Sequence, residues 1–205
     1  MNLKDTYNRI GDDWFKGHTE DTWFHTGADK FISFLKPGAS VLDVGCGGGL
    51  ASKYLVEKGV ALTGVDFSEK MVEIATREVP KGKFFMGDMR DLSSLEGEFD
   101  GLYVKAVLLH FQKKEVSVIL QRLLEKLKPS GFLYVAVKEA KPSQQEEQIK
   151  IENDWGYEYQ RFFSFFFFSE MEKYFADAGL KICYKNVTQS GATRWIEVIG
   201  QKETL

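Results

Sequence analysis

The sequence predicts an α/β protein whose core is a doubly wound, mainly parallel sheet that ends in an antiparallel hairpin. Strand-like and helix-like stretches alternate over residues 40–137, which is typical of parallel strands joined by right-handed crossovers. Two of the strand-like stretches, 41–44 and 133–137, are almost entirely apolar, as in strands covered on both faces. The last two, 180–188 and 193–201, are separated by a short polar turn that contains glycine, which indicates a hairpin.

The predicted elements follow one another without an internal repeat or a low-complexity linker. The strands are predicted at 40–44, 61–65, 83–87, 99–105, 131–138, 180–188 and 193–201, and the helices between them at 48–58, 68–78, 113–127 and 170–178. Ser169 and Glu172 have the spacing of a capping box for the last helix, which ends at Ala178-Gly179. Because strands and helices alternate in this way, a Rossmann-like sheet of seven strands is expected.

Two segments outside this alternation are expected to cover the sheet. Residues 1–36 are predicted to form an N-terminal helical lid, in which Gly11 and Gly17 interrupt the first half. Residues 139–168 are predicted to form an insertion or mobile lid, because the polar stretch 139–159 is longer than a simple connection. The phenylalanine-rich run that follows is expected mainly to seal the sheet, with a wall of a ligand pocket as the alternative.

Composition and charge favour a single soluble domain and disfavour a nucleic-acid-binding protein. The 205 residues fit one domain, 1–205, and the hydrophobic fraction of 43% and charged fraction of 28% are ordinary for a soluble protein. The net charge of -3, without a dense block of Lys and Arg, disfavours a nucleic-acid partner. Two cysteines, Cys46 and Cys183, favour a reducing compartment. No segment resembles a signal peptide or is apolar over a bilayer's width, so a cytoplasmic protein without a membrane partner is expected; the oligomeric state is not indicated.

A glycine-rich turn follows the first predicted strand. Asp43, Gly45, Gly47 and Gly49 form the pattern D-x-G-x-G-x-G. The dinucleotide fingerprint G-x-G-x-x-G would need a glycine where Leu50 stands, which disfavours a nicotinamide-dependent oxidoreductase. An acidic residue at the strand end suits a ligand with an amino group or a positive centre. We expect free backbone amides in this turn to contact the ligand; close packing of strand and helix is the alternative.

Further polar residues stand where the next predicted strands end, the edge at which parallel sheets bind ligands. Asp66 ends the second strand, and its carboxylate can accept hydrogen bonds from both hydroxyls of a ribose, with helix capping as the alternative. Asp88 and Met89 follow the third strand, and a solvated loop is the alternative for this aspartate. Lys105 and Ala106 end the fourth strand. One ligand is therefore expected along this edge.

In order and spacing, these motifs resemble those of the class I S-adenosylmethionine-dependent methyltransferases, and the resemblance covers nearly the whole chain. It implies that the last strand is inserted antiparallel and that Asp88 accepts a hydrogen bond from the adenine amino group while the Met89 N–H donates to the ring. Lys105 and Ala106 would face the methionine part through their backbone. The expected cofactor-binding residues are Asp43, Gly45, Cys46, Gly47, Asp66, Phe67, Met71, Asp88, Met89, Lys105 and Ala106, with Phe67 and Met71 flanking the adenine.

Three further side chains are candidates near the reacting methyl group. Tyr7 and Trp14, in the N-terminal segment, are expected to form a flap over the ligand and to stabilise its cation, with core packing as the alternative. His110 is the candidate general base, expected to titrate near neutral pH, with a packed histidine as the alternative. No cluster of His, Asp and Glu has metal-ligand spacing, so no metal is expected.

The sequence therefore predicts in-line transfer of a methyl group from S-adenosylmethionine to a small molecule, with S-adenosylhomocysteine as the product. Residues 104–107 read Val-Lys-Ala-Val where an Asn-Pro-Pro-Tyr-type motif would indicate methylation of DNA bases or protein glutamine. A methyltransferase acting on RNA or protein, and a cofactor-binding module without catalysis, remain the alternatives.

Overall fold

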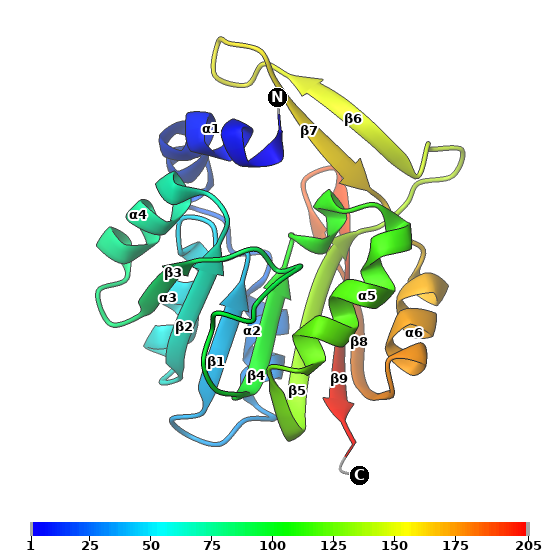
Figure 1. Ribbon diagram of the computed structural model, residues 1–205. Coiled ribbons are helices and arrows are strands. Elements are labelled where there is room, and N and C mark those ends of the chain that lie inside the picture. The colour runs from blue at the N-terminus through cyan, green and yellow to red at the C-terminus, as the bar shows by residue number, and fades with distance from the viewer. Residues whose placement is uncertain (1, 204–205) are drawn as a thin grey trace.

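A computed structural model describes residues 2–203 of the protein. Its main sheet has seven strands in the order β3-β2-β1-β4-β5-β9-β8, of which β9 is antiparallel to both of its neighbours (Figure 1). The strands are β1 (Ser40–Val44), β2 (Ala61–Asp66), β3 (Lys83–Met86), β4 (Phe99–Lys105), β5 (Leu127–Lys138), β8 (Leu180–Ser190) and β9 (Thr193–Lys202). The predicted doubly wound sheet of seven strands with a C-terminal antiparallel hairpin is therefore confirmed.

Helices cover both faces of this sheet. The helices are α2 (His25–Ile32), α3 (Leu50–Glu57), α4 (Glu69–Glu78), α5 (Lys113–Leu124) and α6 (Phe168–Asp177), with a short 3-10 turn η1 (Leu108–His110) after β4. Figure 1 shows α5 and α6 in front of the sheet and α2 and α3 behind it. Each face has its own apolar core, one containing Leu120 and Phe175 and the other Phe31 and Leu55. None of the helices within residues 2–203 has the length and hydrophobicity needed to cross a membrane.

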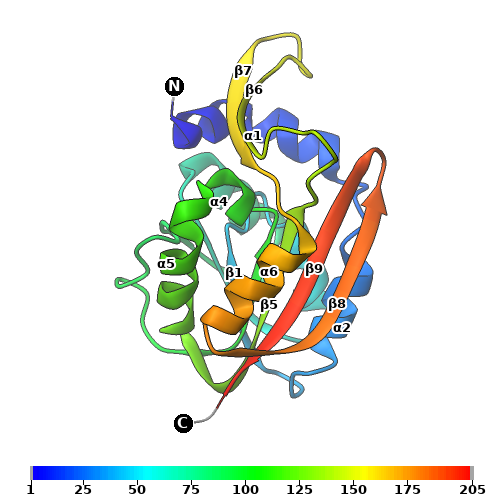
Figure 2. The ribbon, with the colours of Figure 1, turned by 90° about the vertical axis from the view of Figure 1, so that its right-hand side faces the viewer.

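Helix α1 (Leu3–His18) lies across the top of the molecule and continues through both glycines that were predicted to interrupt it (Figure 2). Gly11 is buried where α1 packs against α4, and a Cβ atom there would lie 2.7 Å from Cγ of Lys70. The missing side chain therefore permits close approach of the two helices and does not end the first one. The prediction that Gly11 and Gly17 break the helix was wrong.

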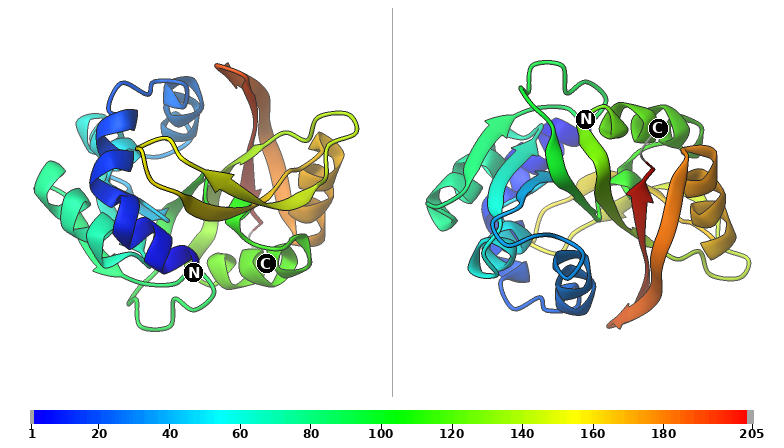
Figure 3. Two further views of the ribbon diagram at one scale, coloured as in Figure 1. Left: turned by 90° about the horizontal axis from the view of Figure 1, so that it is seen from above. Right: turned by 90° about the horizontal axis from the view of Figure 1, so that it is seen from below.

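The segment predicted as an insertion or mobile lid contains secondary structure that the sequence analysis did not predict. Strands β6 (Glu147–Glu152) and β7 (Tyr159–Ser164) pair as an antiparallel hairpin, separate from the main sheet. The hairpin lies above the sheet beside α1, as the view from above shows (Figure 3). The Thr6 hydroxyl donates to the Gln160 carbonyl at 3.0 Å, and the Tyr157 hydroxyl donates to Asp13 at 2.7 Å. We call α1 together with β6 and β7 the cap.

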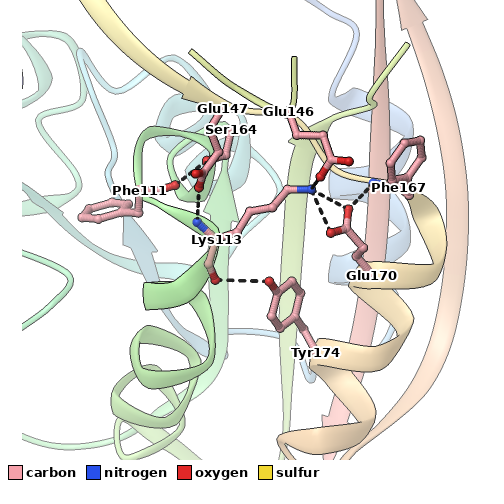
Figure 4. A network of polar contacts seen from close by, with 8 residues as sticks. All are labelled: Phe111, Lys113, Glu146, Glu147, Ser164, Phe167, Glu170 and Tyr174. Atoms are coloured by element: carbon pink, nitrogen blue, oxygen red, sulfur yellow. Dashed lines mark hydrogen bonds and ion pairs between the residues drawn. The ribbon is translucent and has the colours of Figure 1, made fainter. Parts of the chain in front are cut away.

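A network of polar contacts fastens the base of the hairpin to the helices in front of the sheet (Figure 4). The backbone N–H of Lys113, at the start of α5, donates to Glu147 at 2.6 Å. Its ammonium group lies 2.8 Å from Glu170 of α6 and also pairs with Glu146. The Ser164 hydroxyl, at the end of β7, donates to the Phe111 carbonyl at 2.6 Å. Both strands of the hairpin are therefore attached where they leave the main fold.

Helix α6 begins earlier than predicted and has a different cap. Its N-cap is Phe167, whose backbone N–H donates to the Glu170 carboxylate at 2.7 Å. The predicted capping pair, Ser169 and Glu172, lies inside the helix, so that prediction was wrong. The spacing rule looks for Ser or Thr at the cap, whereas this helix begins at a phenylalanine whose backbone N–H alone is bound by Glu170, so the rule selected Ser169 instead.

Candidate active site

A cavity of about 750 Å³ lies at the C-terminal edge of the parallel strands and is also lined by residues of the cap. The structure brings together all the site residues that the sequence predicted. The residues lining the cavity include Tyr7, Trp14, Asp43, Gly45, Cys46, Gly47, Asp66, Phe67, Met71, Asp88, Met89, Lys105, Ala106 and His110. They come from α1 and from the ends of, or the segments that follow, β1, β2, β3 and β4, four neighbouring strands of the sheet.

The glycine turn does not present the free amides that were expected. The N–H groups of Gly45 and Cys46 donate to the Val65 carbonyl at 2.8 and 3.0 Å. The Gly47 N–H donates to Oδ2 of Asp66 at 2.9 Å. These three amides are therefore engaged by β2 and its end, so the turn is fixed against the neighbouring strand before any ligand binds. The prediction of bare amides was wrong for these residues.

Backbone conformation explains why glycine is needed at the start of the turn. Gly45 has φ 69°, and a Cβ atom there would lie 2.4 Å from Cγ2 of Val107. Any other residue would be strained by its backbone and would collide with the segment after β4. Ala106, beside this contact, also has a positive φ of 58° without being glycine. Such strain is characteristic of residues that line functional sites.

Asp66 is held at the tip of β2 with one hydrogen bond to each carboxylate oxygen. Oδ2 accepts from the Gly47 N–H and Oδ1 from the Ser68 N–H, both at 2.9 Å. Burial raises the pKa of Asp66 to about 6, although these backbone donors act in the opposite direction. The start of α4 is capped separately, because the Ser68 hydroxyl accepts from the Met71 N–H at 3.2 Å. Since each carboxylate oxygen has further lone pairs, Asp66 can accept hydrogen bonds from a ligand as well.

Asp43 and Lys105 place opposite charges at the adjoining strand ends. Asp43 is 2% exposed and accepts from the Ser52 hydroxyl at 2.6 Å, and burial raises its pKa to about 6. The Lys105 ammonium lies 4.7 Å from the ring centroid of Phe24 and 5.1 Å from that of Trp23. Burial lowers the pKa of Lys105, and the charge of Asp43 counteracts this effect. The sequence analysis considered only the backbone of Lys105, whereas the residue also brings a positive charge to the cavity.

Asp88 follows the end of β3 by two residues and is ion-paired with Arg90 of the same loop. Its carboxylate accepts from Nε and NH2 of Arg90 at 3.0 and 2.6 Å. Burial alone would raise the pKa of Asp88, but the Arg90 guanidinium lowers it below the usual value. Met89 and Met71 are almost fully buried and give this end of the cavity an apolar wall.

Tyr7 and His110 meet where α1 crosses the segment after β4. The Tyr7 hydroxyl lies 2.9 Å from Nε2 of His110, and Nδ1 of the same ring lies 2.8 Å from the Phe162 carbonyl. Because a carbonyl only accepts, Nδ1 carries the proton, and Nε2 of the neutral ring accepts from Tyr7. Burial lowers the pKa of His110 to about 3, and the charges of Arg161 and Lys138 add to this effect. The expectation that His110 titrates near neutral pH was therefore wrong.

The cap contributes residues that the sequence analysis missed. Arg161 of β7 donates from NH1 to the Tyr7 hydroxyl at 3.3 Å and forms two bonds to Glu152, at 2.7 and 2.8 Å. The residues that line the cavity and were not predicted include Leu3, Val107, Phe111, Gln112, Glu115 and Phe162. Val107 and Phe111 follow a predicted strand end directly, so their place in the sequence could have indicated them. Phe162 is the one member of the phenylalanine-rich run at the cavity, while Phe163, Phe165 and Phe166 are buried in the core.

The chain matches the sequence model of one protein family and several curated relatives. Residues 41–131 match the sequence model of a family described as a methyltransferase domain. The 2-methyl-6-phytyl-1,4-hydroquinone methyltransferase of Synechocystis sp. is 38% identical over 109 residues, which are 51% of this chain and 34% of that protein. The chain spans less than half of the length of three curated relatives that it matches at 35–38% identity.

Solved structures match over almost the full chain. The 1,6-didemethyltoxoflavin-N1-methyltransferase of Burkholderia thailandensis, solved with 1,6-didemethyltoxoflavin and S-adenosylhomocysteine, has a TM-score of 0.78 at 19% identity, covering 98% of this chain and 88% of that one. The magnesium protoporphyrin IX methyltransferase of Synechocystis, solved with S-adenosylhomocysteine, has a TM-score of 0.74 at 19% identity and covers 98% of each chain. At this identity the likeness establishes a shared fold.

Proposed function

We propose that the protein transfers a methyl group from S-adenosylmethionine to a small-molecule acceptor. Residues 41–131 match the methyltransferase-domain family, and the chain shares its fold with solved methyltransferases, which supports this proposal. A cavity of about 750 Å³ lies in the range that small molecules and cofactors occupy. The charged groups of the cavity also suit S-adenosylmethionine. Asp66 can accept hydrogen bonds from its ribose hydroxyls, and Asp43 can accept one from its amino group. Lys105 can face its carboxylate. We propose that the apolar wall of Phe67, Met71 and Met89 receives the adenine.

When bound, the sulfonium supplies an activated methyl group, so the chain has to align the acceptor and exclude water. We assign alignment to the junction of α1 with the segment after β4, where Tyr7 and His110 line the cavity. A histidine whose pKa is about 3 has little tendency to take a proton at neutral pH. We therefore propose that His110 orients the Tyr7 hydroxyl toward the acceptor and is not itself the base. The cap closes this end of the cavity and keeps water out.

The relatives support a small acceptor. Their names describe methyl transfer to 2-methyl-6-phytyl-1,4-hydroquinone, to 1,6-didemethyltoxoflavin and to magnesium protoporphyrin IX. The cap and the net charge of -3 also favour an enclosed small molecule over a nucleic acid.

The observation that carries the proposal is the Asp66 carboxylate, fixed at the cavity by Gly47 and Ser68. We expect S-adenosylhomocysteine to bind the protein in isothermal titration and to raise its melting temperature. Asp66→Ala should weaken that affinity by about 100-fold or more, because bonds from two hydroxyls to a charged acceptor are lost. Asp100→Ala is the matched control, since Asp100 pairs with Lys128 at 2.8 Å near the start of β4. Equal affinity in Asp66→Ala and the wild type would refute the proposed site.

A second experiment separates the candidate functions. The protein is incubated with S-adenosylmethionine carrying a radioactive methyl group and with an extract divided into metabolites, RNA and protein. Label in a metabolite below about 1 kDa supports the proposal. Label in RNA or protein assigns the acceptor to those classes, and binding of S-adenosylhomocysteine without any transfer indicates a cofactor-binding module.

A further inference from the structure

Three cations of the fold surround a single aromatic ring next to the cavity. The Lys138 ammonium lies 4.3 Å from the ring centroid of Phe163, the Arg161 guanidinium 5.1 Å and the Lys150 ammonium 5.5 Å. They come from the end of β5, from β7 and from β6, so the closure of the hairpin over the sheet brings them together. We call Lys138, Lys150 and Arg161 the cation cluster.

Within residues 2–203, ion pairing balances only one of the three positive charges of this cluster. Glu152 is ion-paired with Arg161, whereas no ion pair joins Lys138 or Lys150 to a carboxylate within residues 2–203. Glu139, the chain neighbour of Lys138, pairs with Arg194 instead. Burial together with the charges of Arg161 and Lys150 lowers the pKa of Lys138 to about 8. Aromatic faces compensate a partly buried ammonium only in part, so an anion at this place would be favoured.

The cluster lies behind the part of the cavity wall that Tyr7 and His110 form, although none of its three cations lines the cavity directly. Arg161 donates to the hydroxyl of Tyr7, and the ring of His110 lies 4.9 Å from that of Phe163; Tyr7 and His110 both line the cavity. Lys138 ends β5 on the same edge of the sheet where Lys105 ends β4. A molecule in the cavity that extends past Tyr7 and His110 would therefore bring its far end close to the cluster.

We propose that the cation cluster binds an acidic group of the methyl acceptor, which makes the acceptor an organic anion with a carboxylate or phosphate group. That the bound anion is the methyl acceptor depends on the proposed function. The anion site itself depends only on the three cations. The acidic group fixes one end of the molecule, and the cavity wall at Tyr7 and His110 then determines which atom faces the methyl donor.

The test uses benzoate, phenyl phosphate and the neutral benzamide as probes at constant ionic strength. Binding is measured by isothermal titration to the protein alone and to the protein saturated with S-adenosylhomocysteine. We expect benzoate or phenyl phosphate to bind about tenfold more tightly than benzamide, as for a charge-assisted contact. The anion that binds better identifies the acidic group. Equal affinity for all three probes, or binding of none, would overturn the proposal.

Variants locate the site. Lys138→Met and Lys150→Met keep the length of the side chain and remove its charge, and each should weaken anion binding several-fold while leaving benzamide binding unchanged. Lys185→Met is the control, because the Lys185 ammonium also lies over a phenylalanine ring, 5.6 Å from that of Phe168, but pairs with Glu172. An equal loss in Lys185→Met would overturn the proposed location.

The outcomes also separate this inference from the proposed function. Anion binding that depends on Lys138, in a protein that does not bind S-adenosylhomocysteine, would keep the anion site and refute its role in methyl transfer. Binding of S-adenosylhomocysteine without anion binding would refute the site alone.

Discussion

The two halves of the active site are held in place by different means. In residues 41–131 the site residues sit at strand ends whose positions follow from backbone pairing, as Asp43 is opposite Gly64 and Asp66 is opposite Met86. The cap is held mainly by side chains, such as the bond between Arg161 and Tyr7, which are 154 residues apart. A strand end that is positioned by backbone pairing cannot move without disturbing the sheet, whereas a single substitution can replace a side-chain contact. The half formed by residues 41–131, where we propose that the cofactor binds, is therefore fixed by the fold, whereas the cap, next to the proposed acceptor, can vary.

Gly45→Ala should have the largest effect, because it disturbs the half that depends on the backbone. The new Cβ would lie 2.4 Å from Val107, at a φ of 69°. Left-handed strain and overpacking together should lower the free energy of unfolding by about 2–5 kcal/mol. Gly38→Ala is the control, because its φ is 74° but nothing lies within 4 Å of its Cβ, so only the strain of about 1–2 kcal/mol is expected.

Urea unfolding measures both variants. If Gly45→Ala and Gly38→Ala lower the free energy of unfolding by the same amount, the contact with Val107 does not affect stability and the turn is less rigid than we infer. Adding Val107→Ala to Gly45→Ala should recover only part of the overpacking cost of about 1–3 kcal/mol, because the two Cγ atoms are removed while the Cβ of Val107 still lies 2.7 Å from the new Cβ.

Arg161→Met tests whether the cap opens independently of the sheet. It removes the bonds from Arg161 to Glu152 and Tyr7, at a cost of about 1.5–3 kcal/mol. Hydrogen exchange of the β6 and β7 amides should become about tenfold to a hundredfold faster, with no change in β1, β2 and β4. Arg194→Met, which breaks a more exposed ion pair to Glu139, should have a smaller effect. A uniform increase in exchange over all strands would mean that the cap and sheet unfold together.

The pH dependence of stability tests the environment of His110, between the two halves. The pKa of His110 is about 3 in the folded protein and about 6.5 in an unfolded chain. Because the folded pKa is the lower one, the unfolded chain takes up the extra proton as the pH falls below about 6.5, and the folded state loses stability. From pH 6.5 to 5 this loss amounts to about 2 kcal/mol.

His110→Gln removes this titration. Between pH 7 and 5 its free energy of unfolding should therefore rise by about 2 kcal/mol relative to the wild type, whatever its absolute stability. Urea unfolding at the two pH values measures the difference. A constant difference between the two proteins would show that His110 is not buried in its neutral form.

The same contrast explains what could be predicted from the sequence. Asp66, Asp88 and Lys105 could be placed at one edge because each ends or follows an apolar run, and parallel strands end together. The hairpin could also have been recognised, since Ile149 and Ile151 alternate with polar residues, as in a strand with one exposed face. The overall polarity of residues 139–159 masks this short pattern.

Other features depend on contacts that no local pattern contains. The acceptors of the turn amides, the Val65 carbonyl and the Asp66 carboxylate, come from the neighbouring strand. The low pKa of His110 arises from burial under a hairpin about 50 residues further along the chain, beside Phe162. The sequence shows which residues are present at the site, whereas their protonation and their free donors follow only from packing.

The smallest effect on stability is expected from substitutions on the exposed face of the β6–β7 hairpin. Ile149 and Ile151 are 65% and 63% exposed, so each change to Ser should alter the free energy of unfolding by no more than about 0.5 kcal/mol. Urea unfolding at two protein concentrations measures this. A loss above about 1 kcal/mol that grows with protein concentration would mean that another copy of the chain covers this face. The cap would then be held by an interface as well as by its own side chains, and the contrast between the two halves would apply only to the isolated chain.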